Sequence, residues 1–462
     1  MDDVIDPRLI KESDIFLIPL CLLLLFIFAY LIRKKYEKTP LKKLFFPALF
    51  LRFFFVFLYA IIIQFYYGSG DTVLYYFAVS DMRHAISDNF GTWQEIYFNL
   101  KLDPLNTIYG YFLYDSGYYT HLYMANVSNY MVPRFALPFS YIFFNSYICI
   151  CFCLSFFSFG GCWRIFKMFN EMYPALRKKI AVSVLFLPSI LFWGGSLLKD
   201  SICLGSMGFF IYAIYSIFFR KRKIFSSIVI AIFSGLLLYY IKPYILLCLV
   251  PALLLWLFIQ FRTRIQDRTL RQITGFLFAI VSIVLGIVAL QAITQSELAT
   301  QYSSDKILQT VQGAQNSFES TGEGSGSSFK IGEATNSIGS SLLLFPLGLV
   351  ATFFRPFFWE AGNPLMILSA LEAFAFLILT YIAFRRIGFK RFFSIAFSDS
   401  VVIFCLVFSI LFAGIVGITT TNFGALSRYK IPCLPFYLFA LFIVMHKSGK
   451  FSPNVIFHKK FF

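Results

Sequence analysis

The run IFLIPLCLLLLFIFAYLI, residues 15–32, decides the class of this protein. An α-helix needs about 20 apolar residues to cross a hydrocarbon core of about 30 Å, and this run is close to that length. It follows an acidic stretch and has no small-residue cleavage site, so we expect a first membrane span and no cleavable signal peptide. Similar runs recur along the chain, which is 59% hydrophobic with a mean hydropathy of +0.74. We therefore expect an all-α, polytopic membrane protein.

The apolar runs predict about 11 transmembrane helices, within a range of about 11 to 13, in a single transmembrane domain over 1–462. The predicted spans are 15–33, 44–67, 137–159, 181–197, 200–219, 224–241, 243–260, 272–292, 364–384, 399–417 and 430–446. A shorter run, 342–354, is open between a re-entrant segment and a further crossing. The re-entrant interpretation keeps the basic cluster Arg385–Arg391 in the cytoplasm, so we prefer it.

Two long external loops are predicted between these spans. The first covers 68–136, and its apolar residues from Thr72 to Ile86 recur at steps of three and four, which predicts an amphipathic interfacial helix. Its tyrosine-rich part suits either a lipid headgroup belt or a stacking surface for sugar rings. The second loop covers 293–340 and contains the flexible segment STGEGSGSS, 320–328. It is either a mobile lid or a plain exposed loop.

The net charge of +17 is concentrated where spans end. The basic clusters are 33–43, 164–179, 220–223, 262–271, 385–391 and 447–460. Basic residues beside spans mark the cytoplasmic side, so we expect an external N-terminus and a cytoplasmic C-terminus. This distribution explains the charge without nucleic acid, which we do not expect as a partner; membrane lipids are the expected surroundings.

Cysteine and histidine give no sign of a metal or a disulfide framework. The nine cysteines lie in or beside apolar runs, and their number is odd. The four histidines are scattered and form no pair at ligand spacing. We expect no cofactor, and the sequence does not indicate a divalent metal.

The stretch GSGDTVLYYFAVSDM, 68–82, places an acid where the chain leaves the second span. Asp71 opens the predicted interfacial helix, so it is either a helix cap or a general base at the membrane surface. The two roles are compatible. A charged side chain at the outer edge of a span costs free energy unless it is hydrated, is paired with an opposite charge or has a functional role. The other charged residues expected outside or at membrane depth include Asp81, Arg83 and Arg134.

Four further turns carry cations on the predicted external side. They are FWGGSLLKDS (192–201) with Lys199 and Asp200, YYIKPY (239–244) with Lys242, FFRPFFWEAGNP (353–364) with Arg355 and Glu360, and SRYKIPCLPF (427–436) with Arg428 and Lys430. Each cation alone is compatible with snorkelling to the interface. Together they suggest a site for an anionic lipid headgroup, since arginine donates two parallel hydrogen bonds to phosphate. Glu372, deeper in a span, either pairs with a cation or faces a polar cavity.

Three of these stretches resemble the GT-C class of integral-membrane glycosyltransferases. GDTVLYYFAVSDM is similar to the acidic motif after an early span, with Asp71 at the position of the family's acid. PSILFWGGSLLKD is similar to a span ending in an external polar turn with an acid, here Asp200. SRYKIPCLPFYLFAL resembles the late signature of the aminoarabinose and protein O-mannosyl transferases, matched at Arg428, Tyr429, Pro432 and Pro435. The first motif departs from the family's acidic pair, because threonine follows Asp71.

The resemblance implies a GT-C-like fold and a function in the cell envelope. A polyprenyl-phosphate-linked sugar would be the donor and a glycan or lipid the acceptor, at the periplasmic face of a bacterial inner membrane. Asp71 would be the base of an inverting transfer, with Asp200 as the alternative. The phosphate-binding and substrate-binding set would be Arg428, Tyr429, Lys199, Asp200, Lys242, Arg355, Glu360 and Glu372. A polymerase or ligase of lipid-linked polysaccharide fits the same features, and a transporter or lipid flippase is the non-enzyme alternative. Which sugar, lipid carrier and acceptor are used stays open.

Overall fold

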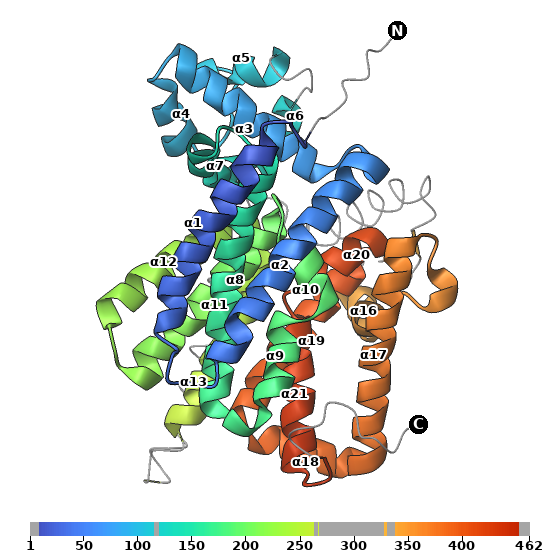
Figure 1. Cartoon of the computed structure of the whole chain (residues 1–462). Coiled ribbons are helices and arrows are strands. Elements are labelled where there is room, and N and C mark those ends of the chain that lie inside the picture. The colour runs from blue at the N-terminus through green and yellow to red at the C-terminus, as the bar shows by residue number, and fades with distance from the viewer. Residues whose placement is uncertain (1–8, 115–119, 263–266, 268–327, 330–337, 452–462) are drawn as a thin grey trace. The chain divides into compact units, whose positions relative to one another are not determined.

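The computed structural model describes residues 9–114, 120–262, 267, 328–329 and 338–451 (Figure 1). Within these ranges the chain is helical, and its β-structure is limited to an isolated bridge between Ser328 and Asn422. Eight of the described helices are long and apolar enough to cross a membrane, or nine if one bent pair is a single span. The expectation of an all-α, multi-pass membrane protein is therefore confirmed. The predicted span 272–292 and most of the loop 293–340 lie outside the described residues, so the count of eleven stays a prediction.

The chain divides into two compact units, and each is described by itself. Unit 1 comprises Met1–Phe169 and Val184–Pro243, and unit 2 comprises Asn170–Ser183 and Tyr244–Phe462. Unit 1 contains α1 (Asp14–Lys34), α2 (Lys42–Ile62), η1 (Ile63–Tyr67), α3 (Asp71–Asp88), α4 (Thr92–Phe98), α5 (Thr107–Tyr114), α6 (His121–Met124), α7 (Val127–Ile142), most of α8 (Tyr147–Met172), α10 (Pro188–Trp193), α11 (Lys199–Tyr215), η3 (Ser216–Arg220) and α12 (Ile224–Ile241). Unit 2 contains η2 (Pro174–Leu176), most of α9 (Arg177–Leu185), α13 (Pro243–Arg262), α16 (Ile338–Phe354), η5 (Phe358–Glu360), α17 (Pro364–Ile387), α18 (Phe389–Ser398), α19 (Ser400–Thr419), α20 (Phe423–Tyr429) and α21 (Leu434–Lys447).

Most predicted spans correspond to one helix each. The predictions 15–33, 224–241, 243–260 and 399–417 match α1, α12, α13 and α19 to within about three residues at either end. The predictions 44–67, 200–219 and 364–384 match the spans Lys42–Tyr67, Lys199–Arg220 and Pro364–Ile387. These runs were predictable because their apolar length alone sets the helix.

Two predicted spans are wrong in their bounds because the backbone breaks inside an apolar run. The run 137–159 contains Phe144 and Asn145 at positive φ (48° and 58°), which ends α7 and lets α8 start at Tyr147. The run 181–197 is divided between α9 and α10, because Pro188 starts a new helix and cannot continue the preceding one. Neither α9 nor α10 is long enough to span.

The last predicted span, 430–446, belongs to a broken element. The short helix α20 and the longer α21 meet at an angle of 63°, with residues 430–433 between them. The run 342–354 lies in α16, whose apolar part Leu344–Phe354 is shorter than a full span. Whether this helix re-enters the membrane, as we prefer, or crosses it stays a prediction.

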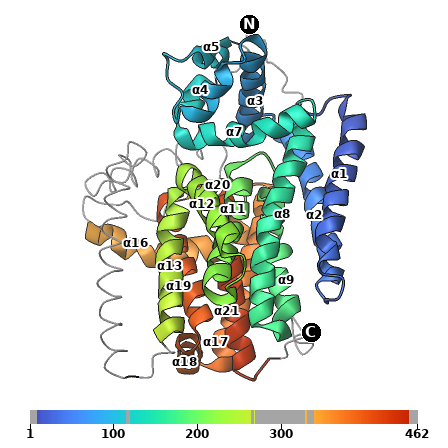
Figure 2. The ribbon, with the colours of Figure 1, turned by 90° about the vertical axis from the view of Figure 1, so that its left-hand side faces the viewer.

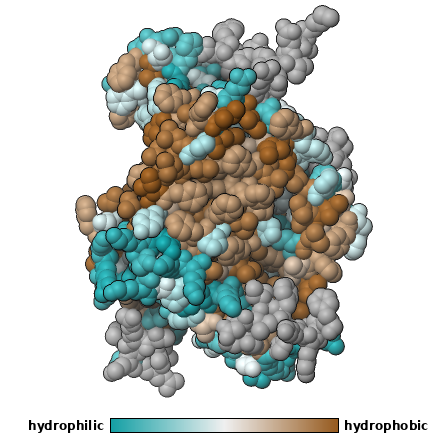
Figure 3. Space-filling view, viewed as in Figure 1, coloured by the Kyte–Doolittle hydropathy of each residue, from teal (hydrophilic) through white to brown (hydrophobic). Residues whose placement is uncertain are grey.

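The basic clusters of unit 1 gather at one end of its helices. Tyr36 in the α1–α2 loop has its ring 5.5 Å from Trp163 on α8, and the Lys167 ammonium lies 5.3 Å from the ring of Tyr212 on α11. At the opposite end, Ser146 before α8 donates a hydrogen bond of 2.5 Å to Asp14 at the start of α1. In unit 1, the loops that carry the basic clusters therefore lie at one end of the helices, and the loops without them lie at the other end. Figure 3 shows apolar side chains over α1 and α2, as expected for a lipid-facing surface.

In each unit, glycines allow one pair of helices to cross with their backbones in contact. In unit 1, a Cβ added at Gly161 on α8 would overlap the backbone of Gly205 on α11, and one added at Gly208 would overlap Gly161. In unit 2, a Cβ at Gly417 on α19 would overlap Gly348 on α16. Small residues at such crossings let backbones touch, which is how helices associate where no hydrophobic effect operates.

The predicted first external loop folds into its own cluster of helices, residues 71–142, which we call the head. Figure 2 shows α3, α4, α5 and α7 grouped at the end of unit 1 where α8 begins. The predicted helix 72–86 is present as α3, and it packs against α4, α5 and α7. Ala78, Met82 and Ala85 of its apolar face are buried, as are Tyr75 and Tyr76, whereas Leu74 and Phe77 are half-buried. The tyrosines of α3 therefore belong largely to the interior of the head. That the apolar face of α3 lies along the membrane stays a prediction.

Candidate functional site

Asp71 is positioned by a turn that only glycine suits. Gly68 has a φ of 66° and Gly70 a φ of 123°, in the region that L side chains rarely adopt. The turn lets the chain leave η1 and start α3 directly at Asp71, with Gly70 as the N-cap. Asp71 is therefore the first residue of the helix, where the positive end of the helix dipole favours a carboxylate. Its side chain is half-buried.

Hydrogen bonds connect the first turns of α3 to α7 and α8. Thr72 Oγ1 and the Tyr147 hydroxyl are 2.8 Å apart. The Tyr75 hydroxyl, one turn after Asp71, donates to Asn129 Oδ1 at 3.3 Å. Asn129 Nδ2 in turn donates to the Tyr123 carbonyl at 2.7 Å. The N-terminal half of α3 is thus held by a polar network and not by apolar packing alone.

The predicted site residues of the stretch 192–201 lie close to this network. Lys199 Nζ donates to Ser128 Oγ at 2.7 Å, and Ser128 adjoins Asn129. Asp200 and Lys242 form an ion pair of 2.6 Å between the start of α11 and the end of α12. Both partners are buried, with 3% and 4% of their surfaces exposed. The carboxylate of Asp200 is therefore engaged by a cation, whereas Lys199 points its ammonium toward the head.

Unit 2 brings together a second group of predicted site residues. Arg355 Nε donates to both carboxylate oxygens of Glu360, at 3.0 and 3.1 Å, and Nη2 makes a further contact. The Arg355 guanidinium also lies 4.5 Å from the ring of Phe329 and 5.1 Å from that of Phe423. These two rings stack at 4.1 Å. Because Phe329 N donates to the Thr421 carbonyl at 2.8 Å, this arrangement joins the segment before α20 to the end of α16.

The break before α21 carries the remaining predicted residues of unit 2. Lys430 is buried and its Nζ donates to the Arg355 carbonyl at 3.1 Å. Glu372 on α17 is 9% exposed and attracts Lys430 electrostatically. Arg428 and Tyr429 are half-buried at the end of α20, with the Arg428 guanidinium 5.8 Å from the Tyr429 ring. Four charges that were predicted from three separate stretches therefore lie within one cluster of unit 2, namely Arg355, Glu360, Glu372 and Lys430.

Sequence reasoning missed one buried cation at membrane depth. Arg52 lies in the middle of the span Lys42–Tyr67 and is 1% exposed. Its guanidinium donates to Ser158 Oγ on α8 and, at 2.6 Å, to the Gly194 carbonyl at the end of α10. An arginine inside an apolar run was a visible signal, since such residues are costly in lipid. It ties α2 and α8 to the turn that leads to Lys199.

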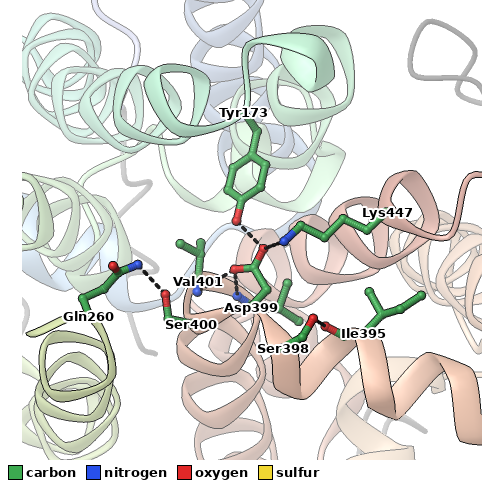
Figure 4. A network of polar contacts seen from close by, with 9 residues as sticks. Tyr173, Gln260, Ile395, Ser398, Asp399, Ser400, Val401 and Lys447 are labelled. Carbon is green, nitrogen blue, oxygen red and sulfur yellow. Dashed lines mark hydrogen bonds and ion pairs between the residues drawn. The ribbon is translucent and has the colours of Figure 1, made fainter. Parts of the chain in front are cut away.

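A second missed network lies at the basic end of unit 2 (Figure 4). Asp399 caps α19 by accepting from Val401 N at 2.9 Å and Val402 N at 3.3 Å. It also accepts from the Tyr173 hydroxyl at 2.6 Å and pairs with Lys447 Nζ at 2.5 Å. Burial acts to raise the pKa of Asp399, but the hydrogen bonds from Lys447 and Tyr173 outweigh it and hold this pKa below its ordinary value. Burial and the hydrogen bond to Asp399 raise the pKa of Tyr173.

The described residues contain no group of three or more His, Cys, Asp or Glu side chains that could hold a metal ion. No protein-family model, curated protein or solved structure matches this chain. Its function must therefore be argued from the two groups of charged residues themselves.

Proposed function

We propose that this protein transfers a sugar from a polyprenyl-phosphate donor to an acceptor hydroxyl at the outer face of the membrane. The observation that carries the proposal is the meeting of α3, α7 and α11 in unit 1. There, the Lys199 ammonium binds Ser128, and the next residue, Asn129, binds α3 one turn after Asp71. Lys199 and the helix that Asp71 opens thus both contact the first turn of α7, although they come from distant stretches of the chain.

In the proposed reaction, Asp71 is the general base. Its carboxylate accepts the proton of the acceptor hydroxyl, whose oxygen forms a bond to the anomeric carbon. The bond between that carbon and the phosphate oxygen breaks, and polyprenyl phosphate leaves with the electron pair. Attack opposite to the leaving group inverts the anomeric centre. We assign the base to Asp71 and not to Asp200, because Asp200 is held in a buried ion pair with Lys242.

Cations would stabilise the leaving phosphate, which is usually a large part of the barrier reduction. Lys199 is the candidate in unit 1, since its ammonium is half-buried and is directed toward the head. In unit 2 the candidate is Arg428, which the sequence resemblance places in the phosphate-binding set. In this proposal, Tyr429 borders Arg428. Glu372 balances the positive charge of Lys430.

The test is transfer of label from a mixed pool of polyprenyl-phosphate sugars to endogenous acceptors in membranes that contain the protein. We expect Asp71→Asn to lower the rate at least about a hundredfold, the usual minimum for loss of a general base. Asp88→Asn, at the other end of α3, is the matched control and should keep the wild-type rate. Equal rates for Asp71→Asn and wild type would refute the assignment of the base.

Product size separates the two enzymatic interpretations. A single added sugar supports a simple transferase, whereas a ladder of products supports a polymerase of lipid-linked polysaccharide. If label moves across the membrane without any new glycosidic bond, the protein is a transporter or flippase and the proposal fails.

A further inference from the structure

One arginine of the head has an unused pair of hydrogen-bond donors. Arg134 on α7 is 5% exposed, and its Nε and Nη2 are both buried without a hydrogen-bond acceptor among the described residues. Its remaining nitrogen, Nη1, donates to the Met131 sulfur at 3.6 Å, and the guanidinium also interacts with the Tyr130 side chain. Nε–H and Nη2–H lie on the same edge of the planar guanidinium and point in parallel. They form the fork with which arginine binds two oxygens of one anion.

Among the described residues, aromatic side chains are the groups that lie against this guanidinium. Its Cζ lies 4.0 Å from the ring of Tyr130, and the Tyr97 hydroxyl donates to the Arg134 carbonyl at 3.2 Å. The groups that act on it electrostatically are these two tyrosines. Glu95 acts on Tyr130, but its own carboxylate accepts from Ile108 N at 3.1 Å. The positive charge of Arg134 is therefore left without a described counter-charge.

A second arginine, on the neighbouring helix α3, repeats the arrangement against the C-terminal part of α7. Arg83 of α3 donates to the carbonyl of Ser140 on α7, and its Cζ lies 4.5 Å from the ring of Tyr141. Tyr141 also acts electrostatically on Tyr97, so the two arginine–tyrosine pairs are neighbours. Tyr97 and Tyr141 are 42% and 46% exposed. Arg134 thus lies against the buried ring of Tyr130, and Arg83 lies against the partly exposed ring of Tyr141.

Burial makes this arrangement costly unless an anion completes it. A buried polar group without a partner costs about 1–3 kcal/mol, and a buried charge costs more. Burial lowers the pKa of Arg134, yet a guanidinium remains protonated at neutral pH. Lipid headgroups, glycans and free anions all offer the required pair of oxygens at the membrane surface.

We propose that Arg134, with Arg83 beside it, is an anion-binding site of the head for a phosphate or carboxylate group. The fork of Arg134 binds two oxygens of the anion, and Arg83 contributes the second positive charge. Tyr97 and Tyr141 border the site and offer flat faces to the uncharged part of the ligand, such as a sugar ring. The proposal does not depend on the transfer reaction assigned to Asp71.

The test is the thermal stability of the full-length protein in an uncharged detergent, at constant ionic strength, with chloride, inorganic phosphate or glucuronate. An anion at about tenfold its dissociation constant should raise Tm by about 2–3 °C relative to chloride. A shift with phosphate alone assigns a phosphate ligand, and a shift with glucuronate alone assigns a carboxylate ligand. Arg134→Gln and Arg134→Lys should both lose the shift, because neither keeps the fork.

Two further variants keep the test decisive. Arg134→Met, which replaces the cation by an apolar chain of similar length, should be at least as stable as wild type in chloride. Arg222→Gln, in the exposed loop before α12, is the matched control for loss of one positive charge and should keep the full anion shift. The proposal is overturned if neither anion shifts Tm up to about 100 mM, or if Arg134→Gln keeps the shift. An Arg134→Met variant that is strongly destabilised in chloride would also overturn it.

Discussion

The Asp399 network offers a prediction in which helix capping and charge pairing can be separated. Asparagine at 399 keeps the oxygen that caps α19 but loses the negative charge, whereas alanine loses both. The hydrogen bond from the half-buried Tyr173 side chain to the carboxylate contributes about 1.5–2 kcal/mol. The pair with Lys447, which is 40% exposed, contributes less, about 0.5 kcal/mol after solvent screening. We therefore expect Asp399→Asn to cost about 2 kcal/mol of unfolding free energy.

Asp399→Ala should cost about 1 kcal/mol more, the usual worth of an N-cap, and so about 3 kcal/mol in total. The assay is unfolding in mild detergent followed by tryptophan fluorescence, with titration by a denaturing detergent. Tyr173→Phe removes one donor and should cost about as much as its hydrogen bond, 1.5–2 kcal/mol. Equal stability of the Asn and Ala variants would refute the capping role, and wild-type stability of both would refute the network.

The same network predicts loss of stability at both extremes of pH. The folded pKa of Asp399 lies below its unfolded value of about 3.9, so its contribution is present above pH 4, roughly, and is lost as the pH falls through the folded pKa. The folded pKa of Tyr173 lies above its unfolded value of about 10. Its contribution is therefore present below pH 10, roughly, and is lost as the pH rises further. Asp399→Asn should flatten the acid limb of a Tm–pH profile, and Tyr173→Phe the alkaline limb.

Three further predictions follow from packing and charge. Gly161→Ala should abolish correct folding or cost more than about 3 kcal/mol, whereas Gly110→Ala, where the structure leaves open space, should change stability by less than about 0.5 kcal/mol in the same fluorescence assay. Lys242→Met should cost about 3–5 kcal/mol of unfolding free energy, because it leaves the buried charge of Asp200 without Lys242. Adding Asp200→Leu should recover most of this loss. A double variant that is less stable than Lys242→Met would contradict the pairing. Arg52→Lys should lower Tm and leave the protein able to fold, because an ammonium cannot reach both Ser158 and the Gly194 carbonyl; an unchanged Tm would argue against the tether.

The sequence predicts helices well where apolar length is the deciding property. The span Ile224–Ile241 was predicted to the residue, since its flanking basic and proline residues end the run on both sides. Prediction failed where the backbone breaks within apolar sequence. Pro188 gave a visible signal for the break between α9 and α10. Phe144 gave no signal, and Asn145 gave a weak one, because asparagine adopts the left-handed conformation more readily than most residues.

The charged residues of the candidate site were identified from sequence, but their partners were not. Lys199, Asp200 and Lys242 stand out because charges are rare at membrane depth. That Asp200 pairs with Lys242, and Lys199 with Ser128, depends on how helices distant in sequence pack together. For Arg134, the sequence shows only that a charge lies on the predicted external side. The structure is needed to show that its Nε and Nη2 are buried without a hydrogen-bond acceptor among the described residues.

The glycine crossings restrict how each unit can move. Where α8 meets α11, the two backbones touch at Gly161, Gly205 and Gly208, and even a methyl group has no room. Sliding either helix along its axis by one turn would bring a larger side chain into that contact. Piston-like and shear motions of this pair are therefore blocked, and the crossing acts as a fixed pivot. Any opening of unit 1 that admits a long lipid-linked ligand must come from rotation about this pivot or from helices that do not cross there, such as α1, whose apolar surface faces outward.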